Sequence, residues 1–290
     1  MPMPRDIGVI DLMIGFPVAD RRHHYDFLKA QLHDKESLED FEFPVQYMFK
    51  DVPKVEEKAD PVAYLLELMD HYNIEKGMIG ASKVGDAAYR AMKDHPDRFF
   101  GSMQVDPNAG MDGVRDLVRA YEELGIKAAT AFPSGLNPQV PINDKKFYPL
   151  YAKCVELDIP ICVCAGVPGP RVPMAPQRVE LIDEVCWYFP ELKFVTRHGC
   201  EPWADLAVKL MLKWPNLYYS TSAFAPKHYP KDIISYANTR GADKIMYAGY
   251  FPMGLSLERI FTDMPGVPFR DHVWPKFLRE NAIRVFKLDD

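Results

Sequence analysis

Short apolar runs, many of them rich in β-branched residues, alternate along this chain with longer segments in which apolar residues recur at helical spacing. Runs of this length with few polar positions are typical of buried parallel strands, whereas the longer segments have the pattern of amphipathic helices. Strands are predicted at 8–13, 76–80, 98–105, 125–132, 160–163, 193–196, 217–221 and 244–248. Helices are predicted at 61–73, 111–124, 145–157, 175–188, 203–213 and 256–262.

The alternation of strands with helices predicts an α/β fold, a (β/α)8 TIM barrel formed by residues 1–290 as a single domain. An open doubly wound sheet is the alternative. No glycine-rich phosphate loop follows the first predicted strand, however, and such a loop is the usual mark of a nucleotide-binding doubly wound sheet. The barrel is therefore the favoured fold.

A long charged and aromatic insertion occupies residues 18–60, directly after the first predicted strand. Loops after the strands build the active sites of TIM barrels, so we expect this insertion to be a lid or a subunit contact rather than a separate domain. The aromatic-rich segment 267–275 is a second candidate for a subunit contact. Both segments could equally fold over their own barrel, but a homodimer is the expectation.

Charge and hydropathy narrow the range of partners. A net charge of −6 gives no sign of the basic surface that nucleic-acid binding needs, so no nucleic-acid partner is expected. No apolar run approaches the roughly 20 residues of a membrane span, and the first residues do not resemble a signal peptide. We therefore expect a soluble cytoplasmic protein that binds a small-molecule substrate. The five cysteines are expected to be buried and unpaired.

Four segments at the predicted strand ends carry a family resemblance. They read VIDLMIGFP at 9–17, IPICVCAG at 159–166, FVTRHG at 194–199 and MYAGYFP at 246–252. Their order and spacing resemble the motifs Asp-x-His-x-His, Pro-x-x-x-His-x-Gly, x-x-His-x-Gly and Gly-Ser-Asp-x-Pro of the amidohydrolase-related TIM-barrel family. The subgroup that the chain resembles includes aminocarboxymuconate semialdehyde decarboxylase, together with lactone and C–C bond hydrolases.

The resemblance implies a metal site from which most ligands have been lost. The positions that match the family's ligands hold Met13, Gly15, Cys164, His198 and Tyr250. In the family a divalent ion lowers the pKa of bound water or polarises a substrate oxygen. A methionine thioether suits soft ions instead, and a glycine offers no side-chain ligand. We therefore expect no conventional zinc site, and no metal or other cofactor in this chain.

Four residues are candidates for catalysis. His198 follows the sixth predicted strand and could be an acid–base or binding imidazole, or a histidine satisfied by a backbone carbonyl. Tyr250 stands where the family has an aspartate, and a phenol suits hydrogen-bond donation better than general-base catalysis. Cys164 could be a nucleophile if His198 lowers its pKa, or a small filler of the pocket. Asp11 could be an inward carboxylate at the barrel mouth or a turn cap.

Other residues are candidates for binding the substrate. Arg171, in the proline-rich loop after the fifth strand, could bind an anionic group. The hydroxyls of Ser220 and Ser222, at the end of the seventh strand, could donate hydrogen bonds to a substrate or cap the strand. Met13 and Phe251 are expected to line the pocket. Strand alternation sends Arg197 in the direction opposite to its neighbour His198, and so toward the helix layer, unless the strand has already ended. Arg197 could otherwise bind a carboxylate.

These observations lead to two hypotheses. The first is a metal-independent enzyme that hydrolyses or decarboxylates a small oxygenated carboxylate or carbonyl compound, with Tyr250 and His198 in proton transfer and oxyanion stabilisation. The second is a catalytically inactive relative that binds a metabolite or a partner subunit. An open pocket with convergent polar groups favours the enzyme. A pocket packed shut by Met13, Tyr250 and Phe251 favours the inactive relative.

Overall fold

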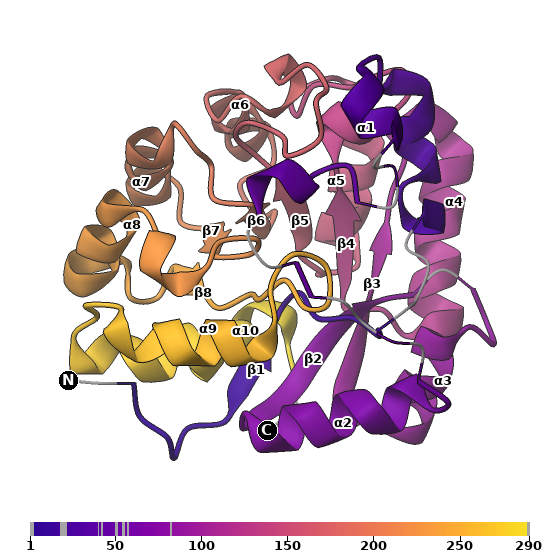
Figure 1. The fold of residues 1–290 in the computed structure, drawn as a ribbon. Helices are drawn as coiled ribbons and strands as arrows, with labels where there is room; N and C mark the ends of the chain where they lie inside the picture. The colour runs from indigo at the N-terminus through magenta and orange to yellow at the C-terminus, as the bar shows by residue number, and fades with distance from the viewer. Residues whose placement is uncertain are drawn as a thin grey trace.

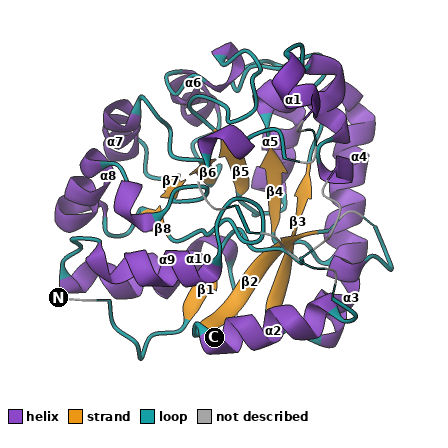
Figure 2. Ribbon diagram, in the orientation of Figure 1, coloured by secondary structure: helices purple, strands orange, loops and turns teal. Residues whose placement is uncertain are grey.

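A computed structural model of the chain describes residues 3–17, 22–39, 41, 43–49, 52–53, 56, 58–81 and 83–288. Parallel strands pair in chain order from β1 to β8 and curl into a half-barrel surrounded by helices (Figures 1 and 2). The strands are β1 (Val9–Asp11), β2 (Ile74–Gly80), β3 (Phe99–Gln104), β4 (Ala128–Ala131), β5 (Ile161–Cys164), β6 (Phe194–Arg197), β7 (Leu217–Ser220) and β8 (Ile245–Met246). The predicted (β/α)8 fold is confirmed.

Helices connect successive strands, as parallel pairing requires. They are α1 (Lys35–Glu39), α2 (Pro61–His71), α3 (Ala87–Asp94), α4 (Met111–Arg119), α5 (Tyr148–Glu156), α6 (Leu181–Tyr188), α7 (Ala204–Lys213), α8 (Lys231–Tyr236), α9 (Leu257–Asp263) and α10 (Asn281–Phe286). Local chemistry explains their starts. The Asp60 carboxylate, for example, accepts hydrogen bonds from the amides of Val62 and Ala63, and Pro61 occupies the first turn of α2.

Several predicted elements are longer than the observed ones, among them the eighth strand and the helix predicted at 175–188, where α6 begins only at Leu181. The prediction ran from 244 to 248, but β8 contains only Ile245 and Met246. The chain leaves the sheet at Tyr247, whose amide donates to the carbonyl of Phe277 rather than to a neighbouring strand. The prediction also omitted four short helices, α1, α3, α8 and α10. The Asp86 carboxylate caps α3 through the amide of Tyr89.

The two edges of the sheet meet at the carboxyl ends of β1 and β8. The amide of Leu12 donates to the carbonyl of Tyr247 at 3.4 Å, and the amide of Gly15 donates to the carbonyl of Phe251 at 2.9 Å. The mouth of the barrel is thus closed by backbone contacts just beyond the short strand β8.

Two apolar layers fill the protein on either side of the sheet. The outer layer lies between the sheet and the surrounding helices. The inner layer consists of alternate strand residues, among them Ile10, Met78, Cys162 and Val195. Helix α10 packs against this inner layer, where the rings of Phe286 and Phe100 lie 5.8 Å apart. Helix α10 therefore forms the floor of the barrel interior.

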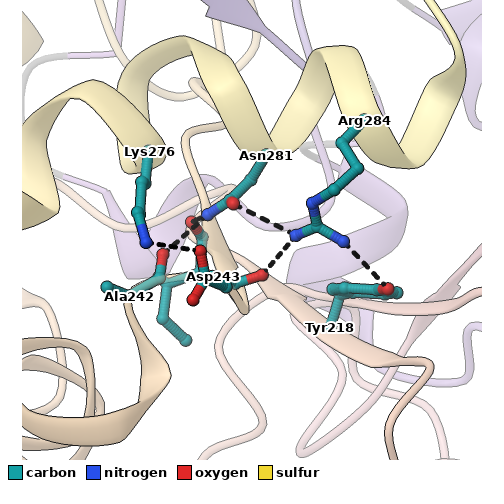
Figure 3. Close-up of polar contacts among 7 residues, drawn as sticks. Tyr218, Ala242, Asp243, Lys276, Asn281 and Arg284 are labelled. Atoms are coloured by element: carbon teal, nitrogen blue, oxygen red, sulfur yellow. Dashed lines mark hydrogen bonds and ion pairs between the residues drawn. The ribbon is translucent and has the colours of Figure 1, made fainter.

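A polar clamp fastens this floor to the amino end of β8 (Figure 3). The buried Asn281 amide donates to the carbonyls of Ala242 and Ile245, at 2.7 and 2.9 Å. Its oxygen accepts a hydrogen bond from Arg284 at 3.1 Å, and Arg284 also donates to the carbonyl of Asp243 at 2.6 Å.

None of the helices in the described ranges is long and apolar enough to cross a membrane.

Candidate active site

The carboxyl ends of β5 and β6 bring two side chains of interest into the barrel interior. In the register of these strands Cys162 pairs with Val195, and Cys164 pairs with Arg197. Cys162 and Val195 belong to the inner apolar layer. Since side chains on one face recur at every second position, Cys164 and Arg197 also point inward, at the level where the strands end.

His198 sits immediately after β6 on unusual backbone. Its φ of +63° is in the left-handed region, as are those of Gly199, at +86°, and Cys200, at +60°. The amide of His198 donates to the Ser222 hydroxyl at 3.0 Å, and the same hydroxyl lies 3.2 Å from Nδ1 of the ring. Enclosure of the half-buried ring, with a smaller effect from the charge of Arg197, lowers the pKa of His198 to about 3. The imidazole is therefore neutral at physiological pH.

Tyr250 lies beside this histidine. The two rings meet edge to face, with centroids 5.7 Å apart and an interplanar angle of 75°. Burial raises the pKa of the Tyr250 phenol above its usual range, so the hydroxyl stays protonated. The mouth of the barrel thus holds a neutral imidazole and a protonated phenol in contact.

The surroundings of Cys164 favour the thiol over the thiolate. Burial raises its pKa to about 11, and the charge of Arg197 opposes this only in part. The expected lowering by His198 is not found, and no hydrogen bond joins the two side chains within the described ranges. This geometry supports the small-filler alternative for Cys164 rather than a nucleophile.

Asp11 ties two loops together at the mouth. Its carboxylate accepts hydrogen bonds from the amide of Met13 at 2.9 Å and from the amide of Gly249 at 2.8 Å. Burial raises its pKa against the effect of these bonds. A Cβ at Gly249 would lie 2.6 Å from Asp11 Oδ2, so glycine is required for this approach. Of the two alternatives for Asp11, the structure supports the turn cap.

Arg171 is engaged away from the His198–Tyr250 pair. Its guanidinium forms ion pairs with Asp34 at 2.6 Å and with Glu36 at 2.7 Å, and it lies 4.5 Å from the centre of the Tyr47 ring. These contacts attach the insertion to the loop after β5. Arg171 therefore has its anionic partners within the protein, which leaves it poorly suited to the substrate-binding role proposed for it.

The other predicted binding residues are Ser220, Ser222, Met13 and Phe251, and they differ in what their side chains contact. The buried Ser220 hydroxyl donates to the carbonyl of Thr196 at 2.8 Å, which makes it part of the sheet. Ser222 supports His198 directly, as described above. Phe251 is buried, whereas Met13 is half-buried and packs against the inner apolar layer.

Of the two alternatives for Arg197, the structure supports the one in which the strand has already ended and the side chain points into the barrel. Strand alternation was counted from His198, but the left-handed backbone there means that the strand has already ended. Counted from Val195, the same rule places Arg197 inside. The charge of Arg197 lowers the pKa values of Cys162, Cys164 and Tyr250, which supports this position.

The described parts of the insertion cover the mouth. Its apolar residues form a cluster with Val172 and Tyr250, which includes Leu28 and Phe43. The ring of Phe49 stacks on Tyr250, with centroids 5.5 Å apart and an interplanar angle of 24°. Its described contacts reach the loops after β4, β5 and β8. Its role as a lid or a subunit contact stays a prediction.

Two hollows of the described surface lie away from the His198–Tyr250 pair. One of about 570 Å³ is at the amino end of the barrel, where Gly8, Ile74 and Arg98 are among its lining residues. A small one of about 10 Å³ lies between Arg171 and the insertion. Neither is bordered by His198 or Tyr250, in keeping with the position of Phe49 on the Tyr250 ring.

A family model for amidohydrolases matches residues 19–288. The chain belongs to the amidohydrolase family. A comparison with curated proteins finds no match for this amidohydrolase.

Solved structures share its fold. An uncharacterised TIM-barrel protein from Bordetella bronchiseptica is 21% identical, with a TM-score of 0.73 over 97% of this chain and 99% of the other. A 2,6-dihydroxybenzoate decarboxylase from Rhizobium is 16% identical, with a TM-score of 0.67 over 98% and 100%. A 5-carboxyvanillate decarboxylase from Novosphingobium aromaticivorans, complexed with manganese, is 16% identical, with a TM-score of 0.69 over 98% and 97%.

The residues of this amidohydrolase do not fit a divalent ion at the family position. Met13 and Gly15 offer no hard ligand, Cys164 is held as a thiol, and Tyr250 is held as a phenol. The remaining histidine has Nδ1 next to the Ser222 hydroxyl. Within the described ranges, no group of three or more His, Cys, Asp or Glu side chains is arranged to hold a metal.

Proposed function

We propose that this chain is a metal-independent enzyme of the amidohydrolase family. It decarboxylates or hydrolyses a small oxygenated carboxylate or carbonyl compound at the barrel mouth. The observation that carries the proposal is the contact between the rings of His198 and Tyr250, together with the left-handed backbone of His198. Such backbone costs about 1–3 kcal/mol per non-glycine residue and is concentrated at functional sites. The decarboxylases of similar fold make hydroxylated aromatic carboxylates the first substrates to test.

Each member of the pair has a chemical role that matches its charge state. Tyr250 is a protonated phenol and can act as the acid or stabilise an oxyanion. His198 is neutral and can accept a hydrogen bond from the substrate, with Ser222 next to its Nδ1 atom holding the ring in place. In a decarboxylation the bond to CO2 breaks and the carbon gains a proton, which Tyr250 donates and then recovers from solvent.

The test is turnover in the presence of a chelator. Native protein is incubated with 2,6-dihydroxybenzoate or 5-carboxyvanillate, and product is measured by chromatography. We expect turnover without metal, and a loss of roughly 10²-fold or more in Tyr250→Phe and His198→Gln. Tyr188→Phe is the matched control, because Tyr188 is exposed on α6. Full turnover by both site variants, or strict dependence on added manganese, would count against the proposal.

A second candidate function is supported by the stacking of Phe49 on Tyr250. A mouth covered in this way also suits an inactive relative that binds a metabolite or a partner subunit. The two candidates differ in the effect of Phe49→Ala. Uncovering the mouth should raise the rate at which an enzyme binds its substrate. In an inactive protein the same change yields no product from any substrate that it binds.

A further inference from the structure

A positive charge inside the barrel has no partner among the described residues. The guanidinium of Arg197 is half-buried at the end of β6, and no described residue gives it a hydrogen bond or an ion pair. Taking a charge out of water is costly unless it is paired, so interior charges are usually matched. By contrast, the half-buried Arg98 and Arg279 form close ion pairs with Asp70 and Glu75. Arg197 thus stands apart from other arginines of comparable burial in this protein.

The groups around Arg197 do not neutralise its charge. Cys164 and Tyr250 are kept in their neutral forms by burial, and His198 is also neutral. The carboxylate of Asp11, at the end of β1, accepts hydrogen bonds from two backbone amides of the loops that it joins, and Arg197 is not among its partners. The pKa of Glu201, four residues along the chain, is raised by burial and by the negative charges of Asp232 and Asp205, with no opposing effect from Arg197. No carboxylate of the described ranges is paired with Arg197.

Arg197 also lies close to the positions at which the family has its metal-binding residues. Cys164, His198 and Tyr250 match three family ligand positions, and the Arg197 charge acts electrostatically on all three. A fixed cation therefore sits among the residues that replace the metal ligands. A guanidinium presents a planar fork of donors that matches a carboxylate with two parallel hydrogen bonds.

We propose that Arg197 binds the carboxylate of the substrate, as a side-chain cation in the region where the family holds its metal ion. The proposal deepens the proposed function, because it assigns the substrate of that site to the carboxylates and names the residue that recognises them.

The test is calorimetric binding of benzoate, with benzamide as a probe of the same shape and no charge. We expect native protein to bind benzoate at least tenfold more tightly than benzamide. Arg197→Met keeps an apolar stem and should remove this preference, whereas Arg197→Lys should retain part of it. Arg178→Met is the matched control, because Arg178 is exposed and paired with Glu180. It should bind as native protein does.

The melting temperature of Arg197→Met is the second measurement, and it tests whether the variant folds. Without benzoate, Arg197→Met should melt at least as high as native protein, because it removes an unpaired interior charge. Benzoate should then raise the melting temperature of native protein but not that of the variant. The proposal is overturned if Arg197→Met binds benzoate as native protein does. It is also overturned if native protein does not distinguish the two probes, whether both bind or neither does.

Benzoate binding and substrate turnover can succeed or fail independently. Benzoate binding that depends on Arg197, in a protein without turnover, supports the anion site and contradicts the proposed enzymatic function. Turnover that depends on Tyr250 but is unaffected by Arg197→Met supports the enzyme and contradicts the anion site.

Discussion

Replacing Asn281 with alanine should loosen the floor of the barrel. The side chain is 1% exposed and makes three hydrogen bonds: to the carbonyls of Ala242 and Ile245, and from Arg284. Each such bond contributes about 1 kcal/mol net, and the buried carbonyls left without a donor add to the loss, so the expected destabilisation is about 3 kcal/mol. Unfolding entropy of about 2 cal/mol/K per residue converts this loss to a fall of roughly 5 °C in Tm.

The assay is thermal unfolding followed by calorimetry and circular dichroism. Asn216→Ala is the matched control, because Asn216 donates one exposed hydrogen bond, to the carbonyl of Pro190 at 2.7 Å. A loss of about 0.5 kcal/mol or less is expected there. If Asn281→Ala melts within about 1 °C of native protein, or no lower than the control, the clamp is not what holds α10 to the sheet.

Three further predictions concern the mouth. The pKa of His198 is lowered in the folded state, so only the unfolded state binds its proton as pH falls from about 6.5 toward 3. This group should therefore lower stability by about 1 kcal/mol between pH 6 and pH 5. Urea titrations should show this drop reduced in His198→Gln and unchanged in the exposed control His228→Gln. Gly249→Ala should cost about 1–3 kcal/mol by crowding the Asp11 carboxylate; a variant as stable as native protein would contradict the close packing. Cys164 should resist iodoacetamide at pH 8 in the folded protein, as mass spectrometry can check, and rapid labelling would refute its burial as a thiol.

The sequence was a good guide to the strands and a poor one to single side-chain directions. The apolar runs marked all eight strands because buried parallel strands carry few polar residues, as in Ile161–Cys164 of β5. The direction of Arg197 depended on where β6 ends, and the left-handed φ of His198 has no local sequence signal beyond the glycine that follows. The pairing of Arg171 with Asp34 joins residues 137 positions apart, which no local pattern reports.

The position of α10 has a consequence for how the protein is made in the cell. The inner apolar layer runs from Ile10 near the start of the chain to Phe286 near its end. The mouth, likewise, closes only when residues beyond β8 meet those beyond β1. A ribosome that has released the first seven strands has thus exposed an unsealed apolar interior. The nascent chain must therefore be protected until its last helix emerges, and premature termination shortly before Asn281 should yield insoluble product.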